Sequence, residues 1–407
     1  MPASSRAAAP RPRPRRRALV RLLPALATGV LAALYRPQAA AAQVELAGEL
    51  DVAYAQDVRQ KSGEARSQIN TSFKGKSPFS LIRFRLQADA PVADGIAATS
   101  ILRYDEGRGE AEIEGAYVVF SSLLGRPRLN VLVGKMAMAF GTFASRGHAT
   151  RNAVIGVPLI YQYFTAAQGG RVPGGPAEQL SYRDAAVRPG RGMPIVYDAC
   201  WNTGVEVFGT ASRLDYALAL TKGTVSNPGS WDNEGAQLVT HFGFRPSMGW
   251  KLGVSTAVGS YLSAGAADAP AFPAGKSVEE FYQVIYGADA QYVFGHWEVA
   301  AEAVRASWEV PNLGDLLTLR GGYLEGSRAL RPGLRVAARL GLIDFAAVAD
   351  GRGGRTDWDY DVGRLETAVE HYVSRNARIK LALQLNYRPD APDDEDHLVG
   401  AQVATAF

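Results

Sequence analysis

Alternating polarity recurs along this chain in short stretches, and no other property of the sequence restricts its fold as strongly. Between Arg378 and Tyr387, every second side chain is apolar and those between them are mostly polar. Successive side chains of a β-strand point to opposite faces, so this period of two predicts strands with one apolar and one polar face. The pattern begins at Val44 and continues to the last residue, Phe407. We therefore expect an all-β protein.

The same stretches decide between a soluble and a membrane-spanning fold. After residue 42 the sequence has no run of ~18 apolar residues, the length that a transmembrane helix needs. A membrane protein without such helices must form a closed barrel, because lipid cannot satisfy open backbone groups. We expect a transmembrane antiparallel up-and-down β-barrel, with one face of each strand toward lipid. A secreted β-sandwich or propeller is the alternative, since its strands also alternate.

Residues 1–42 have the composition of a secretory signal peptide. An arginine-rich start precedes the short apolar stretch 22–34, and three alanines at 40–42 offer a cleavage site. Removing the eight arginines of this segment from the 44 basic residues leaves 36 against 40 acidic residues, a net charge of −4. That balance argues against nucleic-acid binding. We expect a signal peptide at 1–42 and a barrel at 43–407.

The number of strands and the lengths of the connections are those of a large barrel. We count about 16 strands, an even number that suits bacterial barrels of a size with a water-filled lumen. Tight turns, as at 91–95 and 295–296, alternate with longer polar or Gly/Pro-rich segments, as at 262–281 and 346–357. This alternation predicts short periplasmic turns and longer external loops.

The longest connection, 141–200, is apolar and aromatic in its first half. Loops longer than ~15 residues are uncommon and usually functional or disordered. A solvated loop would not carry the side chains of Ile155, Leu159, Tyr161, Tyr163 and Phe164. Two arrangements are open. The segment folds into the lumen, where it narrows or plugs the barrel, or it forms a surface lid or packs against a neighbouring subunit.

Charges of both signs occupy the positions that we expect to face inward. The basic ones are Arg83, Arg85, Arg103, Lys135, Arg335, Arg339, Arg378 and Lys380. The acidic ones are Glu112, Glu114, Glu298, Glu302, Glu366 and Glu370. As separate basic and acidic walls they would steer ions through a polar channel. As cross-strand ion pairs they would contribute little individually.

Short segments of the chain resemble bacterial outer-membrane porins, in particular the superfamily that contains the phosphate-selective porins O and P. Residues 133–141 (VGKMAMAFG) are similar to the strand that precedes the constriction loop of those porins, and 321–339 is similar to a late hairpin. The last strand, ending at Phe407, resembles the closing strand that the barrel-assembly machinery recognises. The chain has no clustered lysine ladder, so phosphate is not the predicted solute.

The resemblance implies a porin in the cell outer membrane of a Gram-negative-type bacterium. Its expected partners are outer-membrane lipid, the barrel-assembly machinery and small polar solutes or ions, with assembly as a homotrimer. Ala-rich strands near 297–306 and 336–348 are the candidate subunit contacts.

The sequence contains no convincing catalytic or metal-binding motif. It has no Gly-x-Ser-x-Gly or Walker motif, and its five histidines are scattered without metal-ligand spacing. His148 lies near Ser145, but chance explains that proximity on a loop. We expect no enzymatic activity, no cofactor and no metal. Two functions are open: a passive diffusion channel for small hydrophilic solutes or ions, or a non-conducting barrel that acts as an adhesin, receptor or structural anchor, with 141–200 plugging it.

Overall fold

The computed structural model describes residues 43–57, 81–106, 110–126, 128–184, 192–197, 201–227, 232–389, 391 and 397–407. The predicted signal peptide, residues 1–42, lies outside the described residues. Within the described ranges the regular structure is almost entirely β, with a few helices of three to six residues. None of the helices described is long and apolar enough to cross a membrane.

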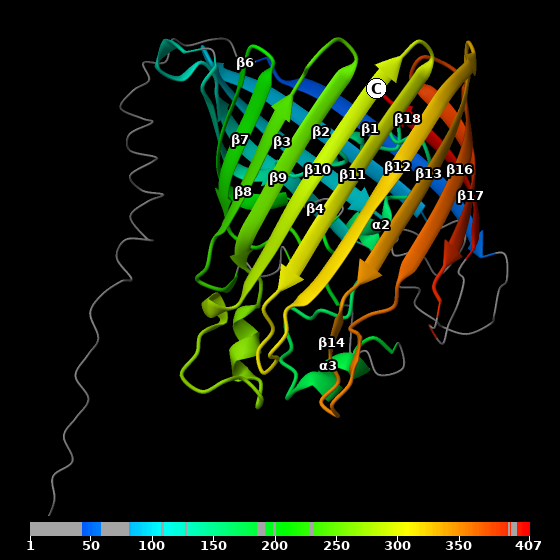
Figure 1. Cartoon of the computed structure of the whole chain (residues 1–407). Helices are drawn as coiled ribbons and strands as arrows, with labels where there is room; N and C mark the ends of the chain where they lie inside the picture. Colours follow the sequence, from blue (N-terminus) through cyan, green and yellow to red (C-terminus); the bar gives the residue numbers. More distant parts are fainter. Residues whose placement is uncertain are drawn as a thin grey trace, which may run out of the picture.

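Sixteen strands form one closed antiparallel barrel, in which β1 pairs with both β2 and β18 (Figure 1). They are β1 (Glu45–Asp57), β2 (Leu81–Ala93), β3 (Ile96–Asp105), β4 (Glu110–Phe120), β5 (Asn130–Ala137), β6 (Trp201–Ala211), β7 (Leu214–Thr221), β8 (Gln237–Phe244), β9 (Trp250–Ser260), β10 (Tyr282–Phe294), β11 (Trp297–Trp308), β12 (Leu317–Arg331), β13 (Leu334–Phe345), β16 (Val362–Tyr372), β17 (Ala377–Tyr387) and β18 (Leu398–Ala406). The predicted up-and-down barrel and its strand number are confirmed. A sandwich or propeller is excluded.

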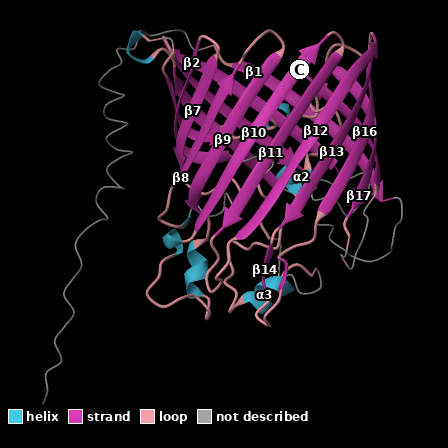
Figure 2. Cartoon of the chain, viewed as in Figure 1, coloured by secondary structure: helices cyan, strands magenta, loops and turns pink. Residues whose placement is uncertain are grey.

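The two ends of the barrel differ in the length of their connections. At one end, tight turns join the strands, and Gly295 and Gly333 adopt positive φ angles of 54° and 79° there. At the other end, longer connections carry the helix α3 (Pro176–Ser181) and a separate hairpin of β14 (Ala347–Ala349) and β15 (Arg355–Asp357) (Figure 2). We call these the turn end and the loop end. The predicted alternation of connection lengths is therefore observed.

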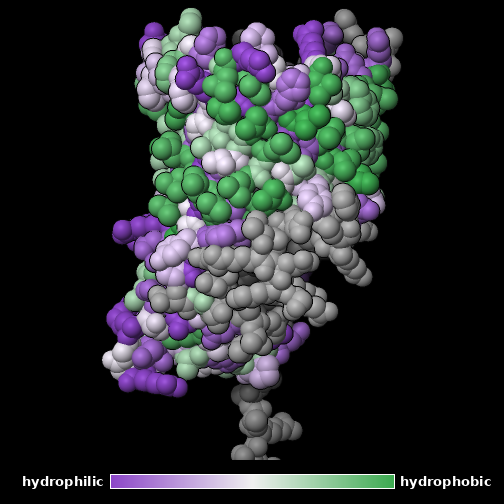
Figure 3. Space-filling view, turned by 90° about the vertical axis from the view of Figure 1, so that its right-hand side faces the viewer, coloured by the Kyte–Doolittle hydropathy of each residue, from purple (hydrophilic) through white to green (hydrophobic). Residues whose placement is uncertain are grey.

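The outer surface is apolar over most of its height. On β17, Ile379, Leu381 and Leu385 are exposed, whereas Lys380 between them is buried inside the barrel. Figure 3 shows the apolar surface over the strands, with hydrophilic residues gathered at both ends. Because the strands leave no open edge, all of their backbone groups can pair, as a lipid environment requires. The barrel therefore has the surface of a membrane-spanning protein.

The last residue completes the closure of the barrel. The backbone amide of Gly48 donates to the Phe407 carbonyl at 2.8 Å, and the Phe407 amide donates back to Gly48 at 3.0 Å. The Phe407 ring covers Gly48 so closely that a Cβ atom there would clash with it. The terminal aromatic thus packs on the outside of the first strand, where β1 and β18 meet.

Two predicted side-chain directions are wrong. A β-bulge places Glu114 of β4 opposite the step between Ile101 and Leu102, which reverses the alternation beyond it. Tyr117, which strict alternation from the inward Glu112 and Glu114 would turn toward lipid, therefore packs against the interior. Lys135, expected to line the lumen, is in register with the exposed residues Ala116 and Thr203 and lies on the outer face.

Candidate functional site

Strands β1 to β4 cover one part of the inner wall with ion pairs. The Arg83 guanidinium on β2 lies 2.7 Å from the Asp51 carboxylate on β1. Arg85 binds Glu114 on β4 with both ends of its fork, Nε to Oε2 at 2.6 Å and Nη2 to Oε1 at 2.7 Å. Bidentate pairs of this kind fix the orientation of both side chains. We call this surface the charged wall.

Arg103 extends the charged wall on β3. Its guanidinium lies 3.0 Å from Asp105, 3.4 Å from Glu114 and 4.0 Å from Glu112. The structure thus brings together five of the residues predicted to line the lumen: Arg83, Arg85, Arg103, Glu112 and Glu114.

A second group of ion pairs lies on β12, β13, β16 and β17. The buried Arg339 lies 2.6 Å from Glu325 and 3.1 Å from Glu366. Arg378 lies 3.4 Å from Glu370. The basic and acidic side chains of this group therefore lie side by side, which favours the ion-pair interpretation over separate walls.

Two further predicted residues differ from each other in their surroundings. Arg335, near the turn end, lies 2.6 Å from Glu298 and is partly exposed. Lys380 is fully buried and donates at 2.6 Å to the carbonyl oxygens of Ala149 and Asn152. These carbonyls belong to the connection between β5 and β6, so Lys380 binds that connection to β17.

The connection between β5 and β6, residues 138–200, is largely buried within its described parts. It contains the short helices η3 (Ala144–Arg146), α2 (Leu159–Gln162) and α3. Four of the predicted constriction residues are buried: Ile155, Leu159, Tyr161 and Tyr163. The fifth, Phe164, is half-buried and forms an isolated bridge with Pro194. We call the described residues of this connection, 138–184 and 192–197, the inserted segment.

Glu302 of β11 anchors the inserted segment through several hydrogen bonds at once. Its carboxylate accepts from the Thr142 amide at 2.9 Å, the Thr142 hydroxyl at 2.7 Å and the Tyr323 hydroxyl at 2.8 Å. It also accepts from the Tyr161 hydroxyl. Burial raises the pKa of Tyr161 well above its usual value, and the adjacent Glu302 charge raises it further. Tyr161 therefore stays protonated and donates.

Arginines supply further anchors. Arg146 of the segment donates to Glu325 and to the Tyr323 hydroxyl, both at 2.6 Å. Burial by itself would lower the pKa of Arg146, but Tyr323, Glu325 and Glu302 around it raise that pKa above its usual range. Arg339 donates to the Gly156 carbonyl at 2.9 Å and to the Asn152 side chain at 2.7 Å. Both the arginine of the segment and the arginine of the barrel therefore have partners where the two surfaces meet.

Between these anchors the inserted segment packs on an apolar surface of the barrel. Inward positions of β9 to β13 carry small or apolar residues that join one buried cluster with the segment; they include Ala257, Ile285, Val304, Ala306, Leu319 and Ile343. Gly287 and Gly321 leave space for Phe140 and Ile160, because a Cβ at either position would lie 3.0 Å from them. We call this surface the apolar wall.

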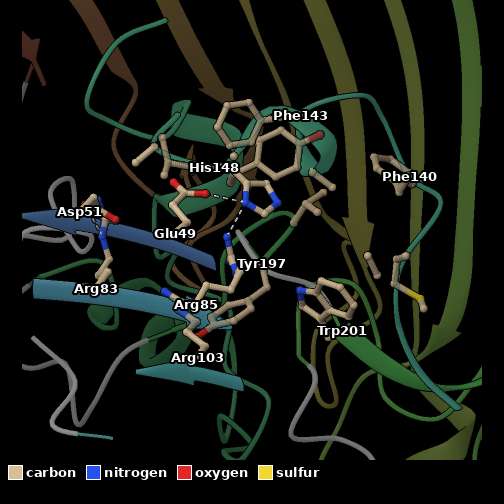
Figure 4. Close-up of a pocket in the computed structure, with 18 of the residues that line it drawn as sticks. Glu49, Asp51, Arg83, Arg85, Arg103, Phe140, Phe143, His148, Tyr197 and Trp201 are labelled. Carbon is tan, nitrogen blue, oxygen red and sulfur yellow. Dashed lines mark hydrogen bonds and ion pairs between the residues drawn. The ribbon is translucent and has the colours of Figure 1, made fainter. Parts of the chain in front are cut away.

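A pocket of about 100 Å³ lies between the inserted segment and the charged wall (Figure 4). Arg83, Arg85 and Arg103 line it from the strands, and Phe143 and His148 line it from the segment.

His148 contacts a cation and an anion through the same ring nitrogen. Its Nδ1 lies 2.8 Å from Arg85 and 3.0 Å from Glu49 (Figure 4). An unprotonated Nδ1 accepts from Arg85, whereas a protonated one donates to Glu49. The Thr150 amide also donates to Glu49, at 3.1 Å. These bonds join the segment to β1 and β2 on the far side of the barrel from β11.

Several of these residues were not predicted as site residues. Glu49 and Asp51 lie on the polar face of the first strand, so the alternating pattern could have identified them as inward-facing residues. Arg146 and His148 lie in a segment without periodicity, so no pattern indicated their partners. Among the described residues there is no cluster of three or more His, Cys, Asp or Glu side chains that could hold a metal ion.

No protein-family model matches the sequence, and no curated protein matches it. Solved structures do match. A loop-deletion form of OmpT, an outer membrane protein of Vibrio cholerae, is 11% identical with a TM-score of 0.55, covering 90% of this chain and 100% of that one. The anion-selective porin from Comamonas acidovorans is 10% identical with a TM-score of 0.53, covering 90% and 100%.

The outer membrane channel DcaP of Acinetobacter baumannii is 12% identical with a TM-score of 0.53, covering 91% of this chain and 99% of that one. At these identities the similarity shows the fold alone. The fold is that of bacterial outer-membrane porins. The narrower resemblance to the phosphate-selective porins O and P stays a prediction.

Proposed function

We propose that this protein is an outer-membrane porin, a passive diffusion channel for small hydrophilic solutes or ions in a Gram-negative-type bacterium. The apolar outer surface, the charged interior and the porin fold support this proposal. The observation that carries it is the pocket beside the charged wall, where open space is lined by paired charges. Signal-directed export, recognition of Phe407 by the assembly machinery and a homotrimeric state belong to the same proposal.

The inserted segment would set the width of the channel. Its bonds to Glu302, Arg339 and Lys380 hold it against β11, β13 and β17. A solute would then pass between the segment and the charged wall. Because each arginine there has a carboxylate partner, the lining offers both signs of charge to a polar solute.

A plugged, non-conducting barrel is the second candidate, and one observation favours it. The segment bonds to β9 through Gly141 and Ser255 and to β1 through Thr150 and Glu49, so it extends across the interior. The pocket between the segment and the charged wall measures only about 100 Å³. Such a barrel would serve as an adhesin, receptor or structural anchor. We propose no enzymatic role for either form.

Single-channel conductance of the purified, refolded protein in a planar bilayer separates the two candidates. Discrete current steps under a salt gradient are the expected result. A folded barrel, identified by its heat-dependent mobility in gels, that gives no steps would overturn the channel proposal and favour the plug.

A further inference from the structure

Two arginines point outward from the barrel beside each other. Arg305 of β11 and Arg320 of β12 are register partners, and both are exposed. Their chain neighbours Val304 and Leu319 are buried in the interior, which places the two guanidinium groups on the opposite, lipid-facing side. Within the described chain, neither guanidinium forms an ion pair or hydrogen bond. Asp344, the register partner of Arg320 on β13, is exposed without an ion pair to it.

This arrangement leaves an excess of positive charge, because Asp344 can balance only one of the two arginines. Like charges at directly opposite positions of neighbouring strands repel. A charged side chain on the lipid face costs most at the bilayer midplane and little near the interface. Arg305 and Arg320 should therefore lie at the edge of the apolar band, next to charged groups of the membrane.

The height of the band can be measured along β12. Arg328 also points outward, near the turn end, and its guanidinium lies 5.1 Å from the centre of the Trp297 ring. Trp297 belongs to a stacked aromatic row with Phe294 and Tyr292, typical of an interfacial girdle. Arg320 and Arg328 are eight positions apart, which corresponds to a distance of about 27 Å along the strand. At a strand tilt of ~40°, this is about 20 Å measured across the membrane. The arginine pair therefore lies at the other interface, on the loop side.

The surface between the pair and the girdle begins with small residues and continues to Leu324, which is exposed. Directly toward the girdle from Arg305 and Arg320 are Ala303 and Gly322, which are again register partners. Ala301 follows on the same face. An acyl chain can lie flat on such small residues while its headgroup reaches the arginines.

We propose that Arg305 and Arg320 bind the phosphate groups of an outer-leaflet lipid whose acyl chains pack over Ala303 and Gly322. A planar guanidinium matches the geometry of a phosphate with two parallel hydrogen bonds. Two adjacent guanidinium groups offset the charge of a doubly phosphorylated headgroup. The phosphates in turn reduce the repulsion between the two guanidinium groups. The inference rests on the proposed outer-membrane location with the loop end outside.

The test measures binding of lipid A, a doubly phosphorylated glucosamine lipid, to the full chain in detergent micelles. The variants are Arg305→Gln/Arg320→Gln and, as a matched control on the same strand and face, Arg328→Gln. Affinity for lipid A should fall at least about tenfold in the double variant and stay unchanged in the control. Wild-type protein should bind dephosphorylated lipid A as weakly as the double variant binds the intact lipid.

Equal binding by wild type and double variant, or equal binding of the two lipids, would overturn the proposal. The proposal would also be overturned if the wild type formed an oligomer without lipid and the double variant did not. A second copy of the chain, and not a lipid, would then occupy the site. Conductance is recorded in parallel and should be the same in all three proteins. If the protein bound lipid A in a phosphate-dependent way but gave no conductance, the channel proposal would be overturned and the proposed lipid site would be retained.

Discussion

The charged wall and the apolar wall belong to one barrel and are built by the same alternation of side chains, yet they hold the interior in different ways. On the charged wall, arginines and carboxylates of neighbouring strands pair with each other, as Arg83 does with Asp51. On the apolar wall, small residues such as Ala257 and Gly321 leave room for the inserted segment.

The difference shows which wall fixes the segment. Burying apolar surface contributes roughly 25 cal/mol per Å², and the inserted segment buries a long row of aromatic and aliphatic side chains on β9 to β13. On the charged wall the ion pairs join the strands to each other, and the segment contacts that wall through hydrogen bonds of His148 and Thr150. The apolar wall therefore holds the segment in place, and the charged wall is left to face the open space.

Removing the segment is the strongest test of this division. Deleting residues 150–190 should raise single-channel conductance several-fold, because the lumen of a 16-stranded barrel is otherwise wide enough for water. Heat-dependent gel mobility reports whether the barrel still folds with its apolar wall uncovered. Unchanged conductance in a folded variant would show that the segment does not narrow the passage.

A single anchor of the apolar wall should have a large effect on stability. Glu302→Ala removes the acceptor of the Thr142 amide and of the Tyr161 and Tyr323 hydroxyls, leaving buried donors unpaired. We expect a loss of about 3 kcal/mol in the free energy of unfolding by urea in micelles. Glu298→Ala, on the same strand and face but partly exposed, is the control and should change stability little. Equal losses in both variants would contradict the special role of Glu302.

Much of the fold could be predicted from the sequence, because lipid on one side and water on the other force a period of two. The faces of β17 follow that period without exception between Ile379 and Leu385. The prediction fails where the pleat is interrupted. No residue type announces that Glu114 forms a bulge, and the three successive apolar residues at 131–133 leave the face of Lys135 undefined.

The site was predicted in part. The apolar character of residues 153–164 indicated that this connection is not solvated, and these residues are largely buried. Its partners could not be derived, because the approach of Thr142 to Glu302 or of Ala149 to Lys380 depends on closure of the barrel. Such contacts join residues far apart in the chain, and periodicity carries no information about them.

The charged wall can be tested through ion selectivity. Arg83→Ala/Arg85→Ala leaves Asp51 and Glu114 without these partners, so the lining becomes more negative. The reversal potential under a salt gradient should move by several millivolts toward cation selectivity. Arg328→Ala, on the outer face, is the control and should leave it unchanged. An unaltered potential in the double variant would place the ion path elsewhere.

The smallest expected effect concerns alkaline pH and returns to the apolar wall. Burial and Glu302 raise the pKa of Tyr161 above its usual 10.0, so the folded protein keeps this proton when the unfolded chain loses it. Its contribution to stability is complete below pH 10 and declines by about 1.4 kcal/mol per pH unit above it. Urea unfolding between pH 8 and pH 11 should therefore show a shallower decline for Tyr161→Phe than for wild type. Identical slopes would mean that Tyr161 ionises in the folded barrel and is not held within the apolar wall.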